Sequence, residues 1–427
     1  MYKALFFIVF FMFHTFAIAQ NADYIFHNVN IISMKDDEIL INQSIAVKDG
    51  KILDIASKTK YKSERNIDTK GKYLLPTMAD AHVHFPENDK EFEKVMKLNL
   101  INGVTKLRSM RGNWDDVERK LNYNDKGSYY PKLYFSPPPI RRSYDFSFDE
   151  LEKYVKIAKE YNFDFIKILS IKDNKTLKNL VKLSEKYEVK IGGHFPVNSQ
   201  DFMLSDELIF STNYTSTEHL GGLIAEPDSL ESRISYIINN DVYVCPTLQW
   251  YAIGYGQYEI NEMLNQAGME YISDSVKENW AEGTKKYRAK LGKEAFATEK
   301  QKYAKEMQER FDITKRLNDE GVKLLLRPDS SSKFIVSGFG IFEEIKLYKK
   351  AGLSNFDILK AATVNFASLF NENYGLIDVG AEADFMLLTL NPLENIEALQ
   401  KIDAIYFNGQ YLDKTQLDEI AKSALLD

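Results

Sequence analysis

Residues 76–85, PTMADAHVHF, decide the fold of this chain. They form a short apolar run that ends in His82 and His84. Side chains alternate between the two faces of a β-strand, so a His-x-His pair places both imidazoles on the same face. The segment therefore predicts a strand that presents two nitrogen ligands at its end.

After residue 76, strand-like runs alternate with amphipathic helical stretches. This alternation predicts an α/β fold in which helices cover a parallel sheet. Candidate metal ligands recur at the ends of the first, fourth, fifth, sixth and eighth runs, and closure into a (β/α)8 TIM-like barrel would bring them to one mouth. The eight runs are ADAHVH, GVTKLR, PKLYFS, FDFIKIL, VKIGGH, TSTEH, VYVCPTL and VKLLLRPD.

The two ends of the mature chain are rich in β-type residues. Asp49-Gly50 predicts a hairpin between two strand-like runs. We expect residues 20–75 and 373–427 to form one small β-sandwich, with a final helix, around a barrel of residues 76–372. An insertion at about 250–310 interrupts this barrel. It is interpreted either as an enlarged seventh helix with its own packing core or as a lid that starts at QWYAIGYGQY.

Residues 1–19 have the pattern of a signal peptide, with an apolar run that ends in Ala17-Ile18-Ala19. We expect cleavage after Ala19 and a periplasmic or secreted protein without a stable membrane anchor; the alternative is an uncleaved anchor. Cys245 is the single cysteine, which excludes an internal disulfide. A net charge of -7 without a basic run argues against nucleic acid as a partner.

Further candidate ligands follow the later runs. His194 lies in IGGHFP, His219 in STEHLGG and Asp329 in LLLRPDSS. Neutral imidazoles and a carboxylate are ligands for zinc or a similar divalent ion. Lys167 in FDFIKILS could join them if carbon dioxide carboxylated its amine, because the carbamate is an anion that can bridge two cations. The alternative is an ordinary lysine paired with a carboxylate.

Taken together, HVH, IKI, GHFP, TEHLGG and the Asp of RPD resemble the metal-dependent amidohydrolase superfamily, in its imidazolonepropionase-like and prolidase-like (Xaa-Pro dipeptidase-like) branch. The resemblance implies two divalent ions, with zinc expected. His82, His84 and Asp329 would hold the more buried ion, His194 and His219 the more exposed one, and carboxylated Lys167 would bridge them. Thr77 and the pair Arg327-Pro328 depart from the usual pattern, which puts the substrate in doubt.

This resemblance also implies a reaction. A metal-activated hydroxide would cleave a carbon–nitrogen bond of a dipeptide, N-acyl amino acid or cyclic amide, with Asp329 as proton shuttle. Two alternatives stay open. One is a mononuclear deaminase-like hydrolase, and the other is a catalytically silent binding protein that keeps the metal site.

Candidates for substrate binding follow from side-chain chemistry. The guanidinium fork of arginine matches a carboxylate, and a tyrosine can line the pocket or donate to a developing oxyanion. A surface or structural role is the alternative for each of them, and the oligomeric state stays open, with a homo-oligomer among the alternatives. The candidates are Arg108, Arg111, Arg142, Tyr251 and Arg327.

Overall fold

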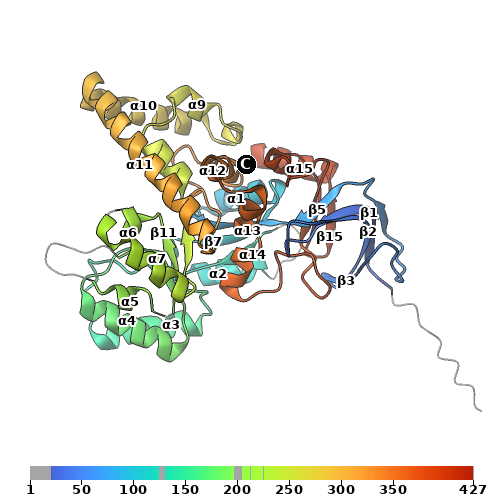
Figure 1. Cartoon of the computed structure of the whole chain (residues 1–427), viewed down its shortest axis with the longest axis horizontal. Coiled ribbons are helices and arrows are strands. Elements are labelled where there is room, and N and C mark those ends of the chain that lie inside the picture. Colours follow the sequence, from blue (N-terminus) through green and yellow to red (C-terminus); the bar gives the residue numbers. More distant parts are fainter. Residues whose placement is uncertain (1–20, 125–129, 197–203, 212, 225, 427) are drawn as a thin grey trace, which may run out of the picture.

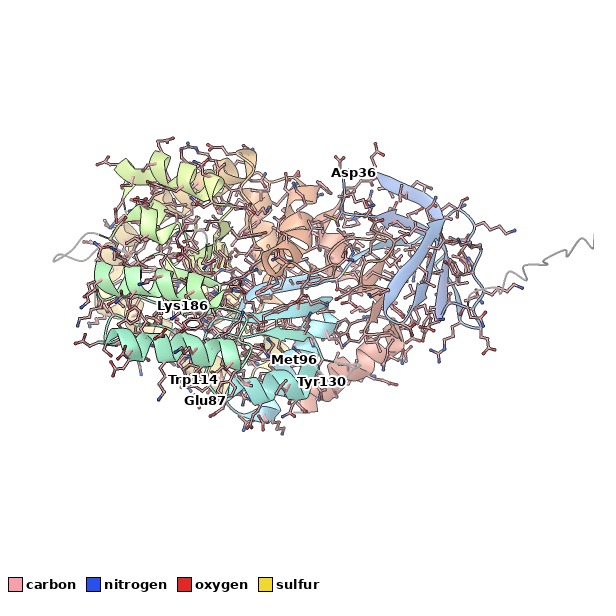
Figure 2. All side chains as sticks on the ribbon, turned by 90° about the horizontal axis from the view of Figure 1, so that it is seen from below. Asp36, Glu87, Met96, Trp114, Tyr130 and Lys186 are labelled. Carbon is pink, nitrogen blue, oxygen red and sulfur yellow. The ribbon has the colours of Figure 1, made fainter. Side chains whose placement is uncertain are left out.

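A computed structural model describes residues 21–124, 130–196, 204–211, 213–224 and 226–426. The signal-peptide prediction for residues 1–19 lies outside the described residues. The molecule has a β-rich end and a larger part in which helices surround short strands (Figure 1). Asp36, in the β-rich end, and Lys186, on a helix of the larger part, lie on opposite sides of the molecule (Figure 2).

The β-rich end is one mixed sheet of eight strands, in the order β15-β14-β13-β5-β1-β2-β3, with β4 paired to β1. Asp49 and Gly50 connect β2 to β3 with φ values of 49° and 70°, the left-handed conformation that a two-residue hairpin turn requires. The strands are β1 (Tyr24–Ile32), β2 (Ile39–Lys48), β3 (Lys51–Ala56), β4 (Asn66–Asp68), β5 (Tyr73–Pro76), β13 (Phe385–Leu388), β14 (Ile402–Phe407) and β15 (Gln410–Asp413).

Both ends of the chain contribute to this sheet. β13 pairs antiparallel with β5, and Leu387 lies opposite Leu74. Alternate side chains of these strands point to a shared apolar cluster that includes Phe26, Phe385 and Tyr406. Burial of this cluster holds the two chain ends together, as expected from the sequence, in a β-rich unit.

The larger part contains two parallel sheets. Their strands are buried except at Lys132 of β8, His194 of β10 and Thr215 of β11, which are partly exposed, as parallel strands covered by helices are. One sheet has β6 (Met78–Val83), β7 (Val104–Ser109) and β8 (Lys132–Tyr134), and the other has β9 (Ile166–Ile168), β10 (Ile191–His194), β11 (Tyr214–Glu218) and β12 (Tyr243–Cys245).

Isolated bridges join these sheets. Ile140 bridges to Ile168 of β9, and the segment after residue 321 bridges both to β12, at Leu324, and to β6, at Ser330. The eighth expected strand, VKLLLRPD, is therefore held by single bridges instead of a regular ladder. One reason is that the Leu326 N–H donates at 3.0 Å to the carbonyl of Ala361 on a helix.

Helices alternate with the parallel strands. In α3, for example, Ser147 and Glu150 form a capping box that starts the helix. The helices around the parallel strands are α1 (Asp89–Ile101), α2 (Asp116–Asn124), α3 (Phe148–Glu160), α4 (Asn174–Tyr187), α5 (Asp206–Ile209), α6 (Gly221–Ile224), α7 (Leu230–Asn239), α12 (Gly340–Lys350), α13 (Asn355–Ala362) and α14 (Val364–Phe370). The chain also has the short helices η1 (Pro227–Ser229) and η3 (Ile396–Gln400) and the final helix α15 (Lys414–Leu426). Among the described helices, none is both long and apolar enough to span a bilayer.

The insertion is helical and projects from one corner of the molecule (Figure 1). Its elements are α8 (Leu248–Gly254), α9 (Ile260–Leu264), η2 (Met269–Tyr271), α10 (Asp274–Leu291) and α11 (Lys293–Asp319). Met263, Met269 and Tyr271 pack with Phe334 and Val336 in a separate apolar cluster. The insertion thus packs in a cluster that it shares with residues outside it, while its first helix, α8, directly follows strand β12.

Candidate metal centre

The six predicted metal ligands line one cavity of about 660 Å³. They come from five segments, with His82 and His84 together at the end of β6, and each segment lies in or directly after a parallel strand or follows residues 322–327. The cavity is lined by His82, His84, Arg142, Lys167, Leu169, Ser170, Ile171, Lys172, His194, Phe195, Glu218, His219, Gly221, Trp250, Tyr251, Asp329 and Ser332. The structure therefore brings together all six side chains that the sequence singles out.

His82, His84 and Asp329 form the tightest group, with ligand atoms within 4.8 Å of one another. The Nε2 atoms of His82 and His84 lie 3.1 Å apart, and Asp329 Oδ1 lies 3.4 Å and 2.9 Å from them. Burial raises the pKa of Asp329, but its hydrogen bond with His84 and the charge of Arg327 outweigh this effect and lower the pKa to about 2. Two imidazole nitrogens and a carboxylate that converge in this way fit a divalent ion such as zinc.

His194 and His219 lie beside this group. Their rings meet edge to face, with centroids 4.7 Å apart. Burial lowers the pKa of His194 to about 2 and that of His219 to about 4. Both imidazoles are therefore neutral at pH 7, the state in which imidazole binds a metal ion.

Lys167 is buried in β9 and lines the same cavity. Burial lowers its pKa to about 8, although the charges of Glu218 and Asp329 oppose this effect. Among the described side chains, none forms a hydrogen bond or salt bridge with the Lys167 ammonium.

Two of the candidate ligands have a strained backbone. His219 has φ 71° and Asp329 has φ 67°, in the left-handed region of backbone conformation that residues other than glycine rarely adopt. His219 directly follows β11, so this turn breaks the strand alternation and lets the consecutive side chains of Glu218 and His219 both line the cavity. Strain of this kind is typical of functional sites that the surrounding structure holds in place.

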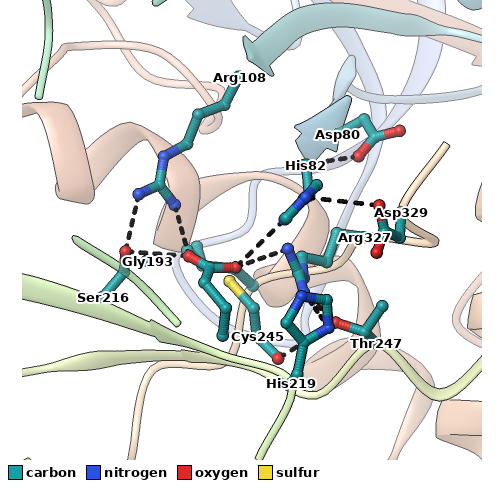
Figure 3. Close-up of polar contacts among 12 residues, drawn as sticks. Asp80, His82, Arg108, Gly193, Ser216, His219, Cys245, Thr247, Arg327 and Asp329 are labelled. Atoms are coloured by element: carbon teal, nitrogen blue, oxygen red, sulfur yellow. Dashed lines mark hydrogen bonds and ion pairs between the residues drawn. The ribbon is translucent and has the colours of Figure 1, made fainter. Parts of the chain in front are cut away.

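Arg108, Arg327 and His82 belong to a buried network of polar contacts (Figure 3). The Glu218 carboxylate pairs with Arg108 at 3.2 Å and with Arg327 at 2.6 Å. Arg327 Nη2 also lies 2.9 Å from His219 Nδ1 and contacts the Thr247 hydroxyl. The prediction that Arg108 and Arg327 bind substrate is therefore corrected, because both guanidinium groups are fully buried, pair with Glu218 and do not line the cavity.

The other substrate-binding candidates divide in the same way. Arg142 and Tyr251 line the cavity, whereas Arg111 is exposed and does not. Tyr251, together with Trp250, comes from α8, at the start of the insertion, as expected for a pocket wall. Arg310 of α11 packs 3.2 Å from the Tyr251 ring centroid and donates at 2.7 Å to the His219 carbonyl, so the insertion supports this wall.

Sequence reasoning missed Glu218, Asp80 and Arg310. Asp80 is buried and accepts from the His82 N–H at 3.0 Å and from the Ser330 hydroxyl at 2.8 Å, which ties the His-x-His strand to the Asp329 loop. Glu218 and Asp80 each lie within two residues of a candidate ligand on a buried strand, and an acidic residue in that position was the available signal. Arg310 has no such signal, since it lies in a charged helix far along the chain.

Comparisons with known proteins agree with this geometry. The chain matches the amidohydrolase family over residues 73–412. Bottromycin amidohydrolase has a similar structure, with a TM-score of 0.75 and 20% identity over 94% of this chain and 89% of that chain. An Xaa-Pro dipeptidase with bound methionine in its active site gives 0.66 and 16%, over 91% and 99%. Ochratoxinase from A. niger gives 0.68 and 16%, over 92% and 96%.

No curated protein matches the chain. The solved structures share its fold at low identity, and the family match covers the parallel strands together with β5, β13, β14 and nearly all of β15 of the β-rich end. The chain therefore belongs to the amidohydrolase family, a family of hydrolases that act on carbon–nitrogen bonds and generally use divalent metal ions.

Proposed function

We propose that this chain is a binuclear metal-dependent amidohydrolase that cleaves a carbon–nitrogen bond of a small substrate with a free carboxylate. The observation that carries this proposal is the convergence of four histidines, Lys167 and Asp329 on one cavity. The proposal includes closure of β6–β12 and residues 322–327 into a (β/α)8 barrel, which the isolated bridges between the sheets support.

The residues have distinct parts in binding the ions. His82, His84 and Asp329 would hold one ion, His194 and His219 the other, and carboxylated Lys167 would bridge them. When bound, such ions supply Lewis-acid activation of water and of the scissile carbonyl. The low pKa values of His194, His219 and Asp329 keep these groups unprotonated at neutral pH, so protons do not compete for them.

Asp329 is the proposed proton shuttle. It is a carboxylate at neutral pH, lines the cavity and belongs to the tightest group of the site. It can take a proton from the attacking water and return it to the leaving nitrogen. The hydrogen bond from the Ser330 hydroxyl to Asp80 and the left-handed backbone at Asp329 hold the Asp329 carboxylate in position.

The cavity lining supports a substrate class. Besides Lys167, the cations of the cavity lining are Arg142 and Lys172. Such side chains suit a substrate carboxylate. Phe195, Trp250 and Tyr251 form an aromatic wall that suits an apolar side chain. A dipeptide or an N-acyl amino acid can carry both groups, as can a cyclic amide that bears a carboxylate and an apolar substituent, and a dipeptidase is among the similar structures.

One observation favours a second candidate, a hydrolase with a single ion at His82, His84 and Asp329. The Arg327 guanidinium lies 2.9 Å from Nδ1 and 3.3 Å from Nε2 of His219, so it approaches both nitrogens of a ligand that the second ion would need. Arg327 is also one of the departures from the family pattern.

Zinc stoichiometry of the purified mature protein separates the two candidates. Close to two zinc ions per chain supports the binuclear enzyme. Close to one zinc ion per chain supports the single-ion enzyme, if the Arg327→Thr variant then binds a second ion. A protein without bound metal contradicts both candidates. A screen of dipeptides, N-acyl amino acids, lactams and lactones with the zinc-loaded protein then identifies the scissile bond, and ammonia release without peptide cleavage would indicate deamination.

Export is part of the proposal. The apolar leader and its Ala17-Ile18-Ala19 end support cleavage after Ala19. Mass spectrometry of the protein recovered from the periplasm of a bacterial host tests this, and a chain that keeps Met1 and stays with the membrane fraction would contradict it.

A further inference from the structure

Glu218 is a buried carboxylate next to the candidate metal ligands, and it has no part in the proposed reaction. It is 1% exposed, at the end of β11. Its Oε1 atom lies 3.2 Å from Arg108 Nη1 and 3.2 Å from the Ser216 hydroxyl. Its Oε2 atom lies 2.6 Å from Arg327 Nη1 and 3.5 Å from His82 Nδ1. These contacts surround the carboxylate with groups that can donate hydrogen bonds.

The contact with His82 fixes which imidazole nitrogen carries the proton. Arg108 and Arg327 pair with Glu218 and favour its ionised form, which only accepts hydrogen bonds, so we assign the proton of this contact to Nδ1 of His82. A neutral imidazole with its proton on Nδ1 has its lone pair on Nε2. That atom is the one that faces His84 Nε2 at 3.1 Å and Asp329 Oδ1 at 3.4 Å.

We propose that Glu218 is a positioning residue, which holds His82 in the Nδ1–H tautomer and directs its Nε2 lone pair at the metal ion. A carboxylate that accepts from the second nitrogen of a ligating histidine orients the ring and raises its basicity. The inference rests on the proposed metal site, but it is the same for one ion or two, because His82 belongs to the first ion in both candidates.

The two arginines give this carboxylate a fixed orientation. Arg108 donates through Nη1 to Glu218 and through Nη2 to Ser216 at 2.7 Å. These two hydrogen bonds anchor the Arg108 guanidinium to β11 at two points. Arg327 approaches from the loop that carries Asp329. The Glu218 carboxylate is thereby held from β7 and from residues 322–327 at once, with Oε2 3.5 Å from Nδ1 of His82.

The test compares three variants: Glu218→Gln, Glu218→Ala and the control Asp384→Asn. Asp384 forms a buried salt bridge with Lys106 of β7, far from the ligands, so the control also removes a carboxylate from a buried ion pair. Zinc affinity is measured by competition with a chromogenic chelator, and the visible spectrum of the cobalt-substituted protein reports ligand geometry. We expect Glu218→Gln to lose about 10- to 100-fold in zinc affinity and Glu218→Ala to lose at least as much, with a changed cobalt spectrum. Asp384→Asn should keep both.

Wild-type zinc affinity and cobalt spectrum in a folded Glu218→Gln protein would overturn the positioning role and leave the proposed function intact. Failure of the wild-type protein to bind zinc would overturn both. A crystal structure of the zinc-loaded wild-type protein decides the matter if the Glu218 variants do not fold. Ligation through His82 Nε2, with Nδ1 against Glu218, supports the role, and ligation through Nδ1 overturns it.

Discussion

The Nε2 atoms of His82 and His84 face each other 3.1 Å apart. Two protonated nitrogens would repel at this distance, so at least one of them presents a lone pair. Asp329 Oδ1 completes the group at 2.9 Å from His84. This arrangement is a pre-formed site for a cation, and it is the basis of the first prediction.

Replacement of His82 by Ala should abolish both metal retention and activity, because it removes a ligand that has no substitute nearby. Metal content is measured by mass spectrometry of the purified protein, and turnover is measured on the substrate found in the screen. His27→Ala is the matched control, since His27 lies in β1 and bonds Ser44 and Asn66 in the β-rich end. Hydrolysis by a metal-free His82→Ala, His194→Ala double variant would contradict the mechanism.

Asp329→Asn should separate binding from chemistry. The amide oxygen keeps one potential ligand atom, so part of the metal should stay bound. Loss of the proton shuttle should lower kcat by about 10²- to 10⁴-fold. Asp357→Asn, at the start of α13 and outside the cavity, is the control and should keep kcat. An Asp329→Asn protein with full metal content and normal kcat would assign the proton transfer to another group.

Reconstitution of the metal-free protein should depend on bicarbonate and on pH. Only the neutral amine of Lys167 reacts with carbon dioxide, and burial lowers its pKa to about 8. At a constant concentration of dissolved carbon dioxide, the rate of activation by zinc should therefore rise about tenfold per pH unit below pH 8 and level off above it. Lys167→Ala should lose this response and recover activity with added short carboxylic acids. A rate that is independent of bicarbonate would favour an unmodified lysine.

Arg142→Ala should weaken the binding of substrates that have a free carboxylate. Loss of one charge-assisted contact at the cavity mouth corresponds to about 1.4 kcal/mol, or about a tenfold rise in KM, with kcat little changed. The same substrates with an amide in place of the carboxylate should show no such rise. Arg111→Ala is the control, because Arg111 is exposed outside the cavity lining. Equal effects of both variants would argue against carboxylate recognition by Arg142.

The sequence by itself determined the candidate ligands and the general architecture. The His-x-His spacing on a strand, the alternation of strands with helices and the β-type residues at both ends depend on local side-chain periodicity, which a sequence displays directly. The β-rich unit built from both ends, the α8 pocket wall and the convergence of the six side chains agree with those patterns.

Only the tertiary structure decided what lies around the ligands. Arg108 and Arg327 follow strands and carry the right charge for substrate binding, yet the fold buries both against Glu218. Contacts of this kind join residues that are far apart in the chain, such as Arg108 and Glu218, and no local period encodes them. The left-handed backbone at His219, which lets the consecutive side chains of Glu218 and His219 both line the cavity, likewise depends on packing that only the folded chain supplies.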